Sequence, residues 1–186
     1  MTITEKLLTV NQYSRPGIKR GSTTKIAVHY VANPGSTAIA NRNYFENCKT
    51  THTYVSSNYI VGLEGEVIRC VPDDEIAYCT NSANSYSISI ETCHPDSTGK
   101  FNTATYSSLV ELCAQLLSKY NLTSNDLIRH FDVTGKVCPK SFVPEKDGGT
   151  DDNSSTAWNK FKSDVKAKMS GTASSSASSG ASASSG

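Results

Sequence analysis

Two histidines and one cysteine stand where their side chains can act as zinc ligands. His29 lies near the end of an apolar run, His130 follows a helix-like segment, and Cys138 comes eight residues later. Three protein ligands and one open position are typical of a catalytic zinc site, whereas a structural site has four ligands. A histidine in a strand is more often a packed core residue, so His29 alone does not indicate a metal site.

The loop around Cys138 adds a positive charge. Residues 135–139 read GKVCP, and Lys136 precedes Cys138 by two residues. In an extended loop, side chains two residues apart point to the same side. This loop can therefore present a thiolate and an ammonium group together.

The remaining cysteines are scattered singly, mostly in apolar surroundings, and we expect them to be reduced: Cys48, Cys70, Cys79, Cys93 and Cys113. A bond between Cys79 and Cys93 is the alternative. However, with Cys138 on a metal an odd number of cysteines remains, which argues against a full disulfide set.

Apolar periodicity predicts the elements that position these residues. Residues 25–31 and 85–92 are expected to be strands, and residues 54–61 and 66–71 a hairpin with a turn at Glu64 and Gly65. Helices are predicted over residues 36–49 and 103–120, and a last one around Trp158 and Phe161. The expected fold class is α/β: one domain with a mixed central β-sheet flanked by helices and a zinc site at one edge or groove of the sheet.

Composition limits the domains and the partners. From residue 170 onward the chain contains only Gly, Ala, Ser and one Thr, so we expect a domain over residues 1–169 and a flexible linker over residues 170–186. The net charge of +1 indicates no nucleic-acid partner, and no apolar run is long enough to span a membrane. The first residues lack a basic start and a long apolar run, so no signal peptide is expected.

Four motifs occur in order along residues 15–145. They read IAVHYVAN over residues 26–33, HTYVSSNYIV over residues 52–61, YSISIE over residues 86–91, and GKVCP over residues 135–139 with His130 before it. Together they resemble the type-2 N-acetylmuramoyl-L-alanine amidases. This family of zinc amidases includes phage endolysins and bacterial autolysins, and it is related to the peptidoglycan recognition proteins.

The resemblance implies a function and a role for each residue. Zn²⁺ would be held by His29, His130 and Cys138, Glu91 would be the general acid and base, and Lys136 would stabilise the oxyanion. The reaction implied is zinc-dependent hydrolysis of the amide bond between the lactyl group of N-acetylmuramic acid and L-alanine of the stem peptide. The expected partner is bacterial peptidoglycan, attacked at the cell wall by a monomeric catalytic domain, and a wall-binding module is expected beyond the linker.

Two departures from the family pattern bear on the substrate and the base. Many relatives carry a groove histidine where residues 77–81 read AYCTN here, so that contact is missing or replaced. Some branches use a hairpin tyrosine in place of the glutamate; residues 55–59 do not place one clearly, which favours Glu91.

Two other functions stay open. One is a peptidoglycan-binding module without catalysis, which loss of the Cys138 ligand would favour. The other is a cytosolic enzyme that trims soluble muropeptides.

Overall fold

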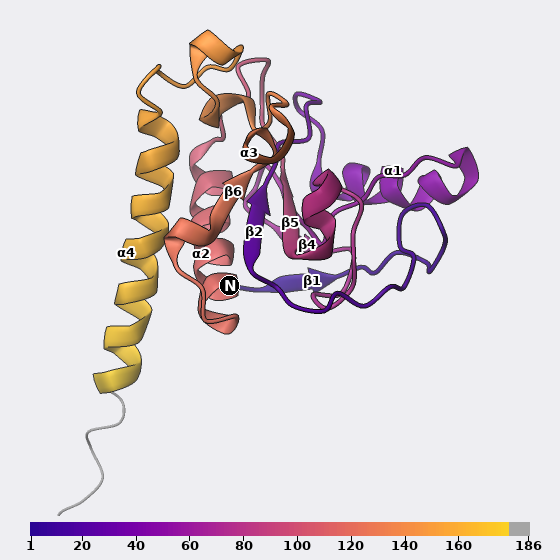
Figure 1. The fold of residues 1–186 in the computed structure, drawn as a ribbon, viewed down its shortest axis with the longest axis horizontal. Coiled ribbons are helices and arrows are strands. Elements are labelled where there is room, and N and C mark those ends of the chain that lie inside the picture. The colour runs from indigo at the N-terminus through magenta and orange to yellow at the C-terminus, as the bar shows by residue number, and fades with distance from the viewer. Residues whose placement is uncertain (179–186) are drawn as a thin grey trace, which may run out of the picture.

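Six short strands form one mixed sheet in the computed structural model, which describes residues 1–178 of the chain (Figure 1). The order across the sheet is β1-β4-β3-β5-β2-β6. Only β3 and β4 are antiparallel, and the other neighbours are parallel. The strands are β1 (Ile3–Glu5), β2 (Lys25–Val28), β3 (Tyr59–Val61), β4 (Val67–Arg69), β5 (Ser87–Thr92) and β6 (Leu127–Arg129).

The predicted hairpin is confirmed as the antiparallel pair β3 and β4. Its turn contains Gly65 at φ +79°. A side chain there would be strained by that φ, and its Cβ would lie 2.9 Å from the carbonyl oxygen of Ala104. The turn can therefore pack directly against the start of the following helix.

Helices cover both faces of the sheet, as predicted. The helix α1 (Ala38–Thr51) packs on one face, whereas α2 (Thr103–Lys119) and α4 (Thr156–Ser178) pack together on the other. Alternation along β3 shows the two layers, because Tyr59 and Val61 belong to the α2–α4 core and Ile60 to the α1 core. A short helix, α3 (His130–Thr134), follows β6 directly. His130 therefore follows a strand, and the expectation of a helix-like segment before it was wrong.

Four short 3₁₀ helices complete the described structure. They are η1 (Asn81–Ser85), η2 (Ser124–Asp126), η3 (Lys140–Phe142) and η4 (Glu145–Asp147). Two of them flank the centre described below, because η1 begins just after Thr80 and η3 begins two residues after Cys138.

The helix α4 extends past the expected domain boundary. Its buried residues Trp158, Phe161 and Val165 pack into the core, with Met169 partly buried against it. The helix then continues to Ser178, because adding residues to an existing helix is easier than starting one. The expected linker over residues 170–186 therefore begins inside a helix, and residues 179–186 lie outside the described part of the chain.

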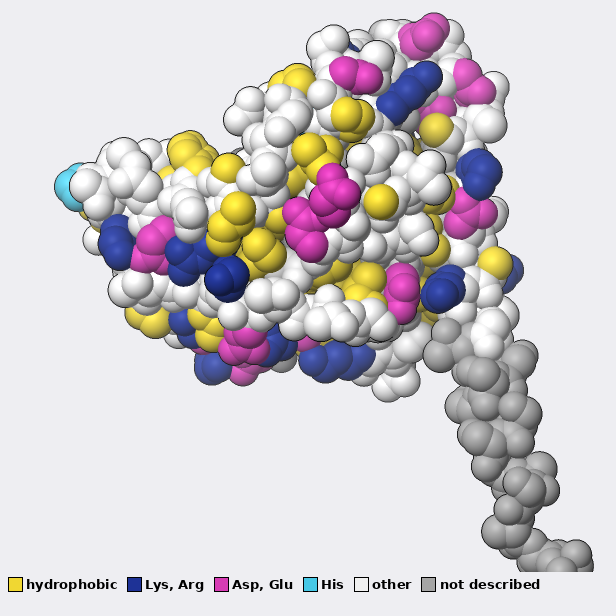
Figure 2. Space-filling view, turned by 180° about the vertical axis from the view of Figure 1, so that it is seen from behind, with side chains coloured by type: hydrophobic (Ala, Val, Ile, Leu, Met, Phe, Trp, Pro, Cys, Tyr) yellow, Lys and Arg dark blue, Asp and Glu magenta, His cyan; other side chains and the backbone are white. Residues whose placement is uncertain are grey.

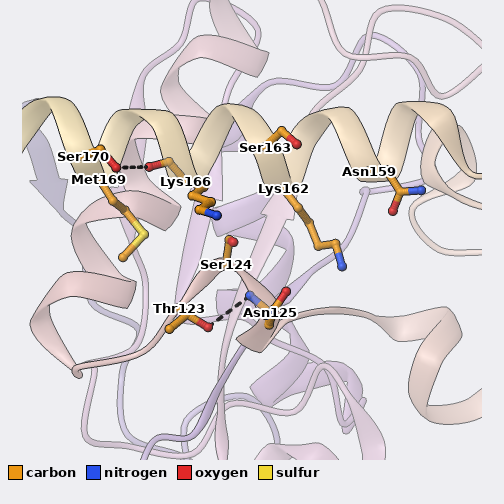
Figure 3. A pocket seen from close by; sticks show the side chains of 9 residues that line it. All are labelled: Thr123, Ser124, Asn125, Asn159, Lys162, Ser163, Lys166, Met169 and Ser170. Carbon is orange, nitrogen blue, oxygen red and sulfur yellow. Dashed lines mark hydrogen bonds between the residues drawn. The ribbon is translucent and has the colours of Figure 1, made fainter.

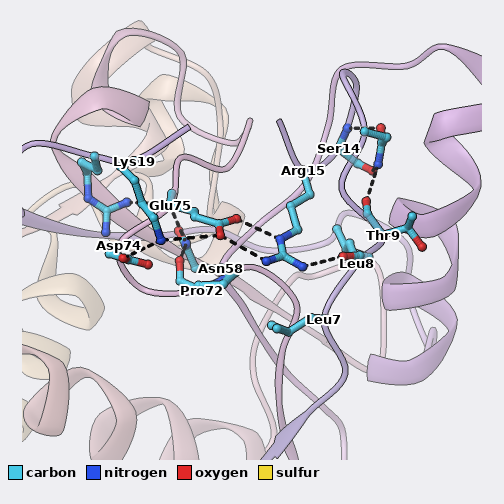
Figure 4. Close-up of polar contacts among 12 residues, drawn as sticks. Leu7, Leu8, Thr9, Ser14, Arg15, Lys19, Asn58, Pro72, Asp74 and Glu75 are labelled. Atoms are coloured by element: carbon cyan, nitrogen blue, oxygen red, sulfur yellow. Dashed lines mark hydrogen bonds and ion pairs between the residues drawn. The ribbon is translucent and has the colours of Figure 1, made fainter. Parts of the chain in front are cut away.

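Polar contacts fasten the N-terminal segment to the sheet (Figure 4). Arg15 donates from Nε to Oε2 of Glu75 at 2.8 Å and from Nη1 to the carbonyl of Leu8 at 2.8 Å. Lys19 pairs with Asp74 at 2.7 Å. These contacts hold residues 6–20 against the loop after β4.

Charges of both signs are mixed on one face of the molecule. On the face seen in Figure 2, Lys and Arg side chains lie among Asp and Glu side chains, and neither sign forms a continuous patch. None of the helices in the described part of the chain has the length and apolar character needed to cross a membrane.

Candidate metal centre

The three predicted zinc ligands meet at the carboxyl ends of neighbouring strands. In the parallel pair β2 and β6, Val28 lies opposite Arg129, so His29 and His130 follow side by side. Their ring centroids are 4.9 Å apart. Cys138 returns to the same place, because its carbonyl accepts a hydrogen bond from the backbone of Phe131 at 3.1 Å.

The donor atoms of this set fit a zinc ion. The nearest ligand atoms of His29, His130 and Cys138 all lie within 4.8 Å of one another, and the three residues are at most 6 % exposed. Nδ1 of His29 is 3.5 Å from Sγ of Cys138. Nδ1 of His130 is buried without a hydrogen-bond partner in the described structure. Two imidazole nitrogens and one sulfur are donors that zinc prefers.

Burial favours the neutral form of all three groups. It lowers the pKa of His29 well below the usual value, assisted by the charges of His130 and Lys136. Burial likewise lowers the pKa of His130. Burial raises the pKa of the Cys138 thiol to about 12. Neutral imidazoles can bind a metal directly. The thiol must first lose its proton, and a bound cation favours that loss.

Glu91 lies beside this set on the neighbouring strand. Val28 pairs with Ile90 in the parallel pair β2 and β5, so His29 and Glu91 follow on adjacent positions. One carboxylate oxygen, Oε1, accepts a contact from Sγ of Cys79 at 3.6 Å, whereas the other is buried without a partner in the described structure. Burial raises the pKa of Glu91 to about 8. A carboxyl group that titrates near neutral pH suits proton transfer in both directions.

Lys136 provides the positive charge of the site. It is exposed, and its carbonyl accepts a hydrogen bond from the backbone of Cys138 at 2.8 Å. After burial, the charge of Lys136 also acts on the pKa of His130 and of Glu91, lowering both. Lys136 thus brings a positive charge to the lining of the cavity.

All five predicted residues line one cavity of about 290 Å³. A second hollow of about 310 Å³ shares Val55, Cys79 and Lys136 with the first and adds Tyr54 and Tyr78. The three shared residues place the two hollows next to each other, and the predicted ligands line the first one. The sequence could not choose which tyrosines line such a groove, and the structure places Tyr30 and Tyr44 beside the metal ligands.

A larger hollow of about 570 Å³ lies elsewhere, between η2 and α4 (Figure 3). Lys162, Lys166 and Met169 line it together with serines, threonine and asparagines. Among the described residues that line it there is no histidine, cysteine or carboxylate, so it offers no metal ligand of those types.

Sequence reasoning did not assign a role to Thr80 and Asn81, whose side chains contact the two histidines. Both belong to residues 77–81, the stretch that departs from the family pattern. That departure was the only feature of the sequence that drew attention to them. All six cysteines are free, so the alternative bond between Cys79 and Cys93 is not formed.

Comparisons with known proteins relate the chain to one family. The sequence profile of the N-acetylmuramoyl-L-alanine amidase family matches residues 19–141. N-acetylmuramoyl-L-alanine amidase CwlL of Bacillus licheniformis is 33% identical over 77% of this chain and 43% of its own length. N-acetylmuramoyl-L-alanine amidase BlyA of Bacillus subtilis strain 168 is 32% identical over 90% of this chain and 48% of its own length. The chain thus spans about half the length of these curated relatives.

Solved structures show the same fold. The structure of PlyL is 26% identical with a TM-score of 0.71, covering 89% of this chain and 98% of that one. The catalytic domain of XlyA is 24% identical with a TM-score of 0.70, covering 89% of this chain and 99% of its own.

Proposed function

The chain belongs to the N-acetylmuramoyl-L-alanine amidase family, and from this premise we propose that it cuts peptidoglycan in a zinc-dependent hydrolysis. The bond cleaved is the amide between the lactyl group of N-acetylmuramic acid and L-alanine of the stem peptide. One observation supports this best: two imidazoles, a thiol, a carboxylate and an ammonium group line a single cavity.

The side chains divide the work between them. His29, His130 and Cys138 would hold zinc, which supplies Lewis acidity toward the amide carbonyl and lowers the pKa of a water molecule. Glu91 takes the proton of the attacking water and delivers it to the leaving amine of L-alanine. Lys136 stabilises the negative charge that develops on the carbonyl oxygen.

The place of action follows from the substrate. We propose that the protein acts at the bacterial cell wall as an endolysin or autolysin, and that one chain suffices because it supplies every group of the site. The curated relatives are about twice as long as the matched part, which supports a further wall-binding module. Such a module would raise the effective concentration of the catalytic domain at an insoluble substrate.

Digestion of purified cell walls tests the reaction. We expect new free amino groups of L-alanine and no new reducing sugar ends. A chelator should abolish the release of amino groups, and added zinc should restore it. New reducing ends would identify a glycosidase and contradict the proposal, and binding to walls without any product would favour the non-catalytic module. Soluble muropeptides offered in parallel identify the trimming enzyme if they alone are cut.

A cysteine substitution tests the ligand set in the same assay. Cys138→Ser should strongly reduce both the zinc content and the amidase activity, because a hydroxyl is a poor zinc ligand. Cys48→Ser is the matched control, since Cys48 is buried in α1 and does not line the cavity, and its contact to the carbonyl of Tyr44 can be kept by a hydroxyl. Full zinc content in Cys138→Ser would show that the ligand assignment is wrong.

A further inference from the structure

Thr80 and Asn81, the two residues that follow Cys79, each form a hydrogen bond with one of the two histidines. Oγ1 of Thr80 lies 2.9 Å from Nε2 of His29. Oδ1 of Asn81 lies 2.8 Å from Nε2 of His130. In both rings the hydrogen-bonded nitrogen is Nε2, so Nδ1 is the nitrogen that remains available to bind a metal. Successive side chains of one short segment therefore contact both metal-binding rings.

The backbone of this segment is held in place from two sides. Oδ1 of Asn84 accepts hydrogen bonds from the backbone of Cys79 at 3.1 Å and of Thr80 at 2.7 Å. On the other side, Ser56 pairs with Tyr78 in both directions: its backbone N–H donates to the carbonyl at 3.0 Å and its hydroxyl accepts at 3.0 Å. These hydrogen bonds hold the backbone from which the side chains of Thr80 and Asn81 extend.

The contact of Asn81 indicates which nitrogen of His130 carries the hydrogen, because the amide oxygen faces the ring. A side-chain amide oxygen only accepts hydrogen bonds, so Nε2 must donate. Nδ1 is then an unprotonated nitrogen, buried and without a partner in the described structure. In the opposite tautomer, a buried N–H would have no acceptor, which is unfavourable.

The contact of Thr80 completes the same arrangement for His29. Nδ1 of His29 faces Sγ of Cys138 at 3.5 Å, which is the side where a shared cation would lie. With Nδ1 used as a ligand atom, the hydrogen resides on Nε2 and the hydroxyl of Thr80 accepts it. Thr80 is fully buried, so no solvent competes for this hydrogen bond.

We propose that Thr80 and Asn81 are positioning residues of the metal centre, which accept Nε2–H of His29 and His130 and so hold Nδ1 of each ring toward the metal. This inference rests on the proposed zinc site. Partners of this kind fix the orientation of a ligand ring and increase its basicity, and their loss typically weakens metal binding by roughly 10–100-fold.

Paired substitutions test each contact. Thr80→Val keeps the shape of the side chain without the hydroxyl, and Thr80→Ser restores the hydroxyl. Asn81 has φ +52°, so Asn81→Gly removes the side chain without backbone strain, and Asn81→Asp keeps an acceptor in the same conformation. Zinc dissociation constants are measured by competition with a chromophoric chelator. We expect Thr80→Val and Asn81→Gly to weaken zinc binding by roughly 10–100-fold each, whereas Thr80→Ser and Asn81→Asp stay close to the parent.

Nitrogen-15 NMR of the histidine rings provides a second readout that does not depend on any variant. Two-bond couplings from the ring protons distinguish the two neutral tautomers. The inference predicts the Nε2–H tautomer for His130 in the metal-free protein, and for both rings in the zinc-loaded protein. Nδ1–H on His130 in the metal-free parent would overturn it.

The outcomes separate this inference from the proposed function. If the parent binds zinc and Thr80→Val and Asn81→Gly bind it equally tightly, the positioning role is wrong, whereas the amidase proposal stands. If the parent binds no zinc, both are wrong. Weakened binding in those two variants, with recovery in Thr80→Ser and Asn81→Asp, supports the positioning role whatever the wall-digestion assay shows.

Discussion

At the scale of single residues, burial and one exposed cation control the titration of the site. Burial lowers the pKa of His29 and His130 and raises that of Glu91 to about 8. Lys136 remains exposed, and its charge lowers the pKa of both Glu91 and Cys138. The same ammonium group thus favours the ionised carboxylate and the thiolate.

Glu91→Gln separates proton transfer from metal binding. The amide keeps the shape of the side chain but cannot accept the proton, so amidase turnover should fall by roughly 10²–10⁴-fold. Zinc content should stay at the level of the parent, because the proposed ligands are other residues. Near-parental turnover would show that another group carries the proton, and loss of zinc would place Glu91 among the ligands or their support.

Lys136→Ala tests the stabilisation of the oxyanion. We expect turnover to fall by roughly 10²–10³-fold, the size seen when one oxyanion donor is removed. Binding of a muropeptide should change little, because this contact strengthens chiefly in the transition state. Lys140→Ala is the matched control, since Lys140 bonds to the carbonyl of Ser97 and does not line the cavity. Equal turnover of the two variants would remove Lys136 from the catalytic set.

At the scale of elements, strand pairing brings the site together. The central strand β2 pairs with β5 on one side and β6 on the other, in parallel. Parallel strands end at the same edge of a sheet, so residues that follow them meet there although they are far apart in sequence. The segment after β4 adds contacts from the side chains of Thr80 and Asn81 to the two histidines.

Acid should weaken the attachment of the N-terminal segment to α1. Although burial acts to raise the pKa of Glu46, its hydrogen bonds to Lys49 and Thr9 and the charge of Arg42 lower that pKa to about 2. Since the unfolded pKa is about 4.3, this stabilisation is present above that pH and is lost as pH falls toward 2. Glu46→Gln should therefore reduce the free energy of unfolding by about 1 kcal/mol at pH 7, a value kept small by screening near the surface.

The measurement is denaturant unfolding of the parent and of Glu46→Gln between pH 7 and pH 3. The difference between the two proteins should shrink as the pH falls, and metal loss at acid pH cancels because it affects both. Glu64→Gln is the control, since Glu64 forms no ion pair in the described part of the chain and is exposed between β3 and β4. A difference that is constant with pH would contradict the assigned pKa.

At the scale of the whole molecule, the family match and the fold do not end at the same residues. The match covers residues 19–141, whereas β1 and α4 lie outside it. Both still belong to the folded unit, because β1 pairs with β4 and α4 packs along α2. The folded unit therefore includes more of the chain than residues 19–141, which contain all five predicted site residues.

Truncation locates the end of the stable domain. Removing residues 172–186 should leave the melting temperature essentially unchanged, because the described contacts of α4 with the core end at Met169. Phe161→Ala is the contrasting variant: Phe161 is fully buried, and its truncation should destabilise the protein by about 3–5 kcal/mol. A marked drop in melting temperature for the truncated chain would show that the last residues dock on the domain.

The sequence by itself determined the family, the fold class and most of the helices and strands, and it singled out five residues that line one cavity. Apolar periodicity predicted the hairpin, α2 and the mixed sheet, because burial on one face imposes its spacing on local sequence. His29, His130 and Cys138 were predicted because few side-chain types bind zinc. The linker from residue 170 was predicted from composition. Composition alone does not show that a helix packed on the core can continue into a Ser- and Ala-rich stretch.

Tertiary structure alone decided the atomic arrangement around the histidines. Thr80 and Asn81 lie 51 and 49 positions away from their partners His29 and His130, and no local pattern relates such residues. The short strand β6 was missed because three residues are too few to show periodicity, yet it places His130 beside His29. A hydrogen bond depends on distances of about 3 Å between atoms, and only the folded chain sets them.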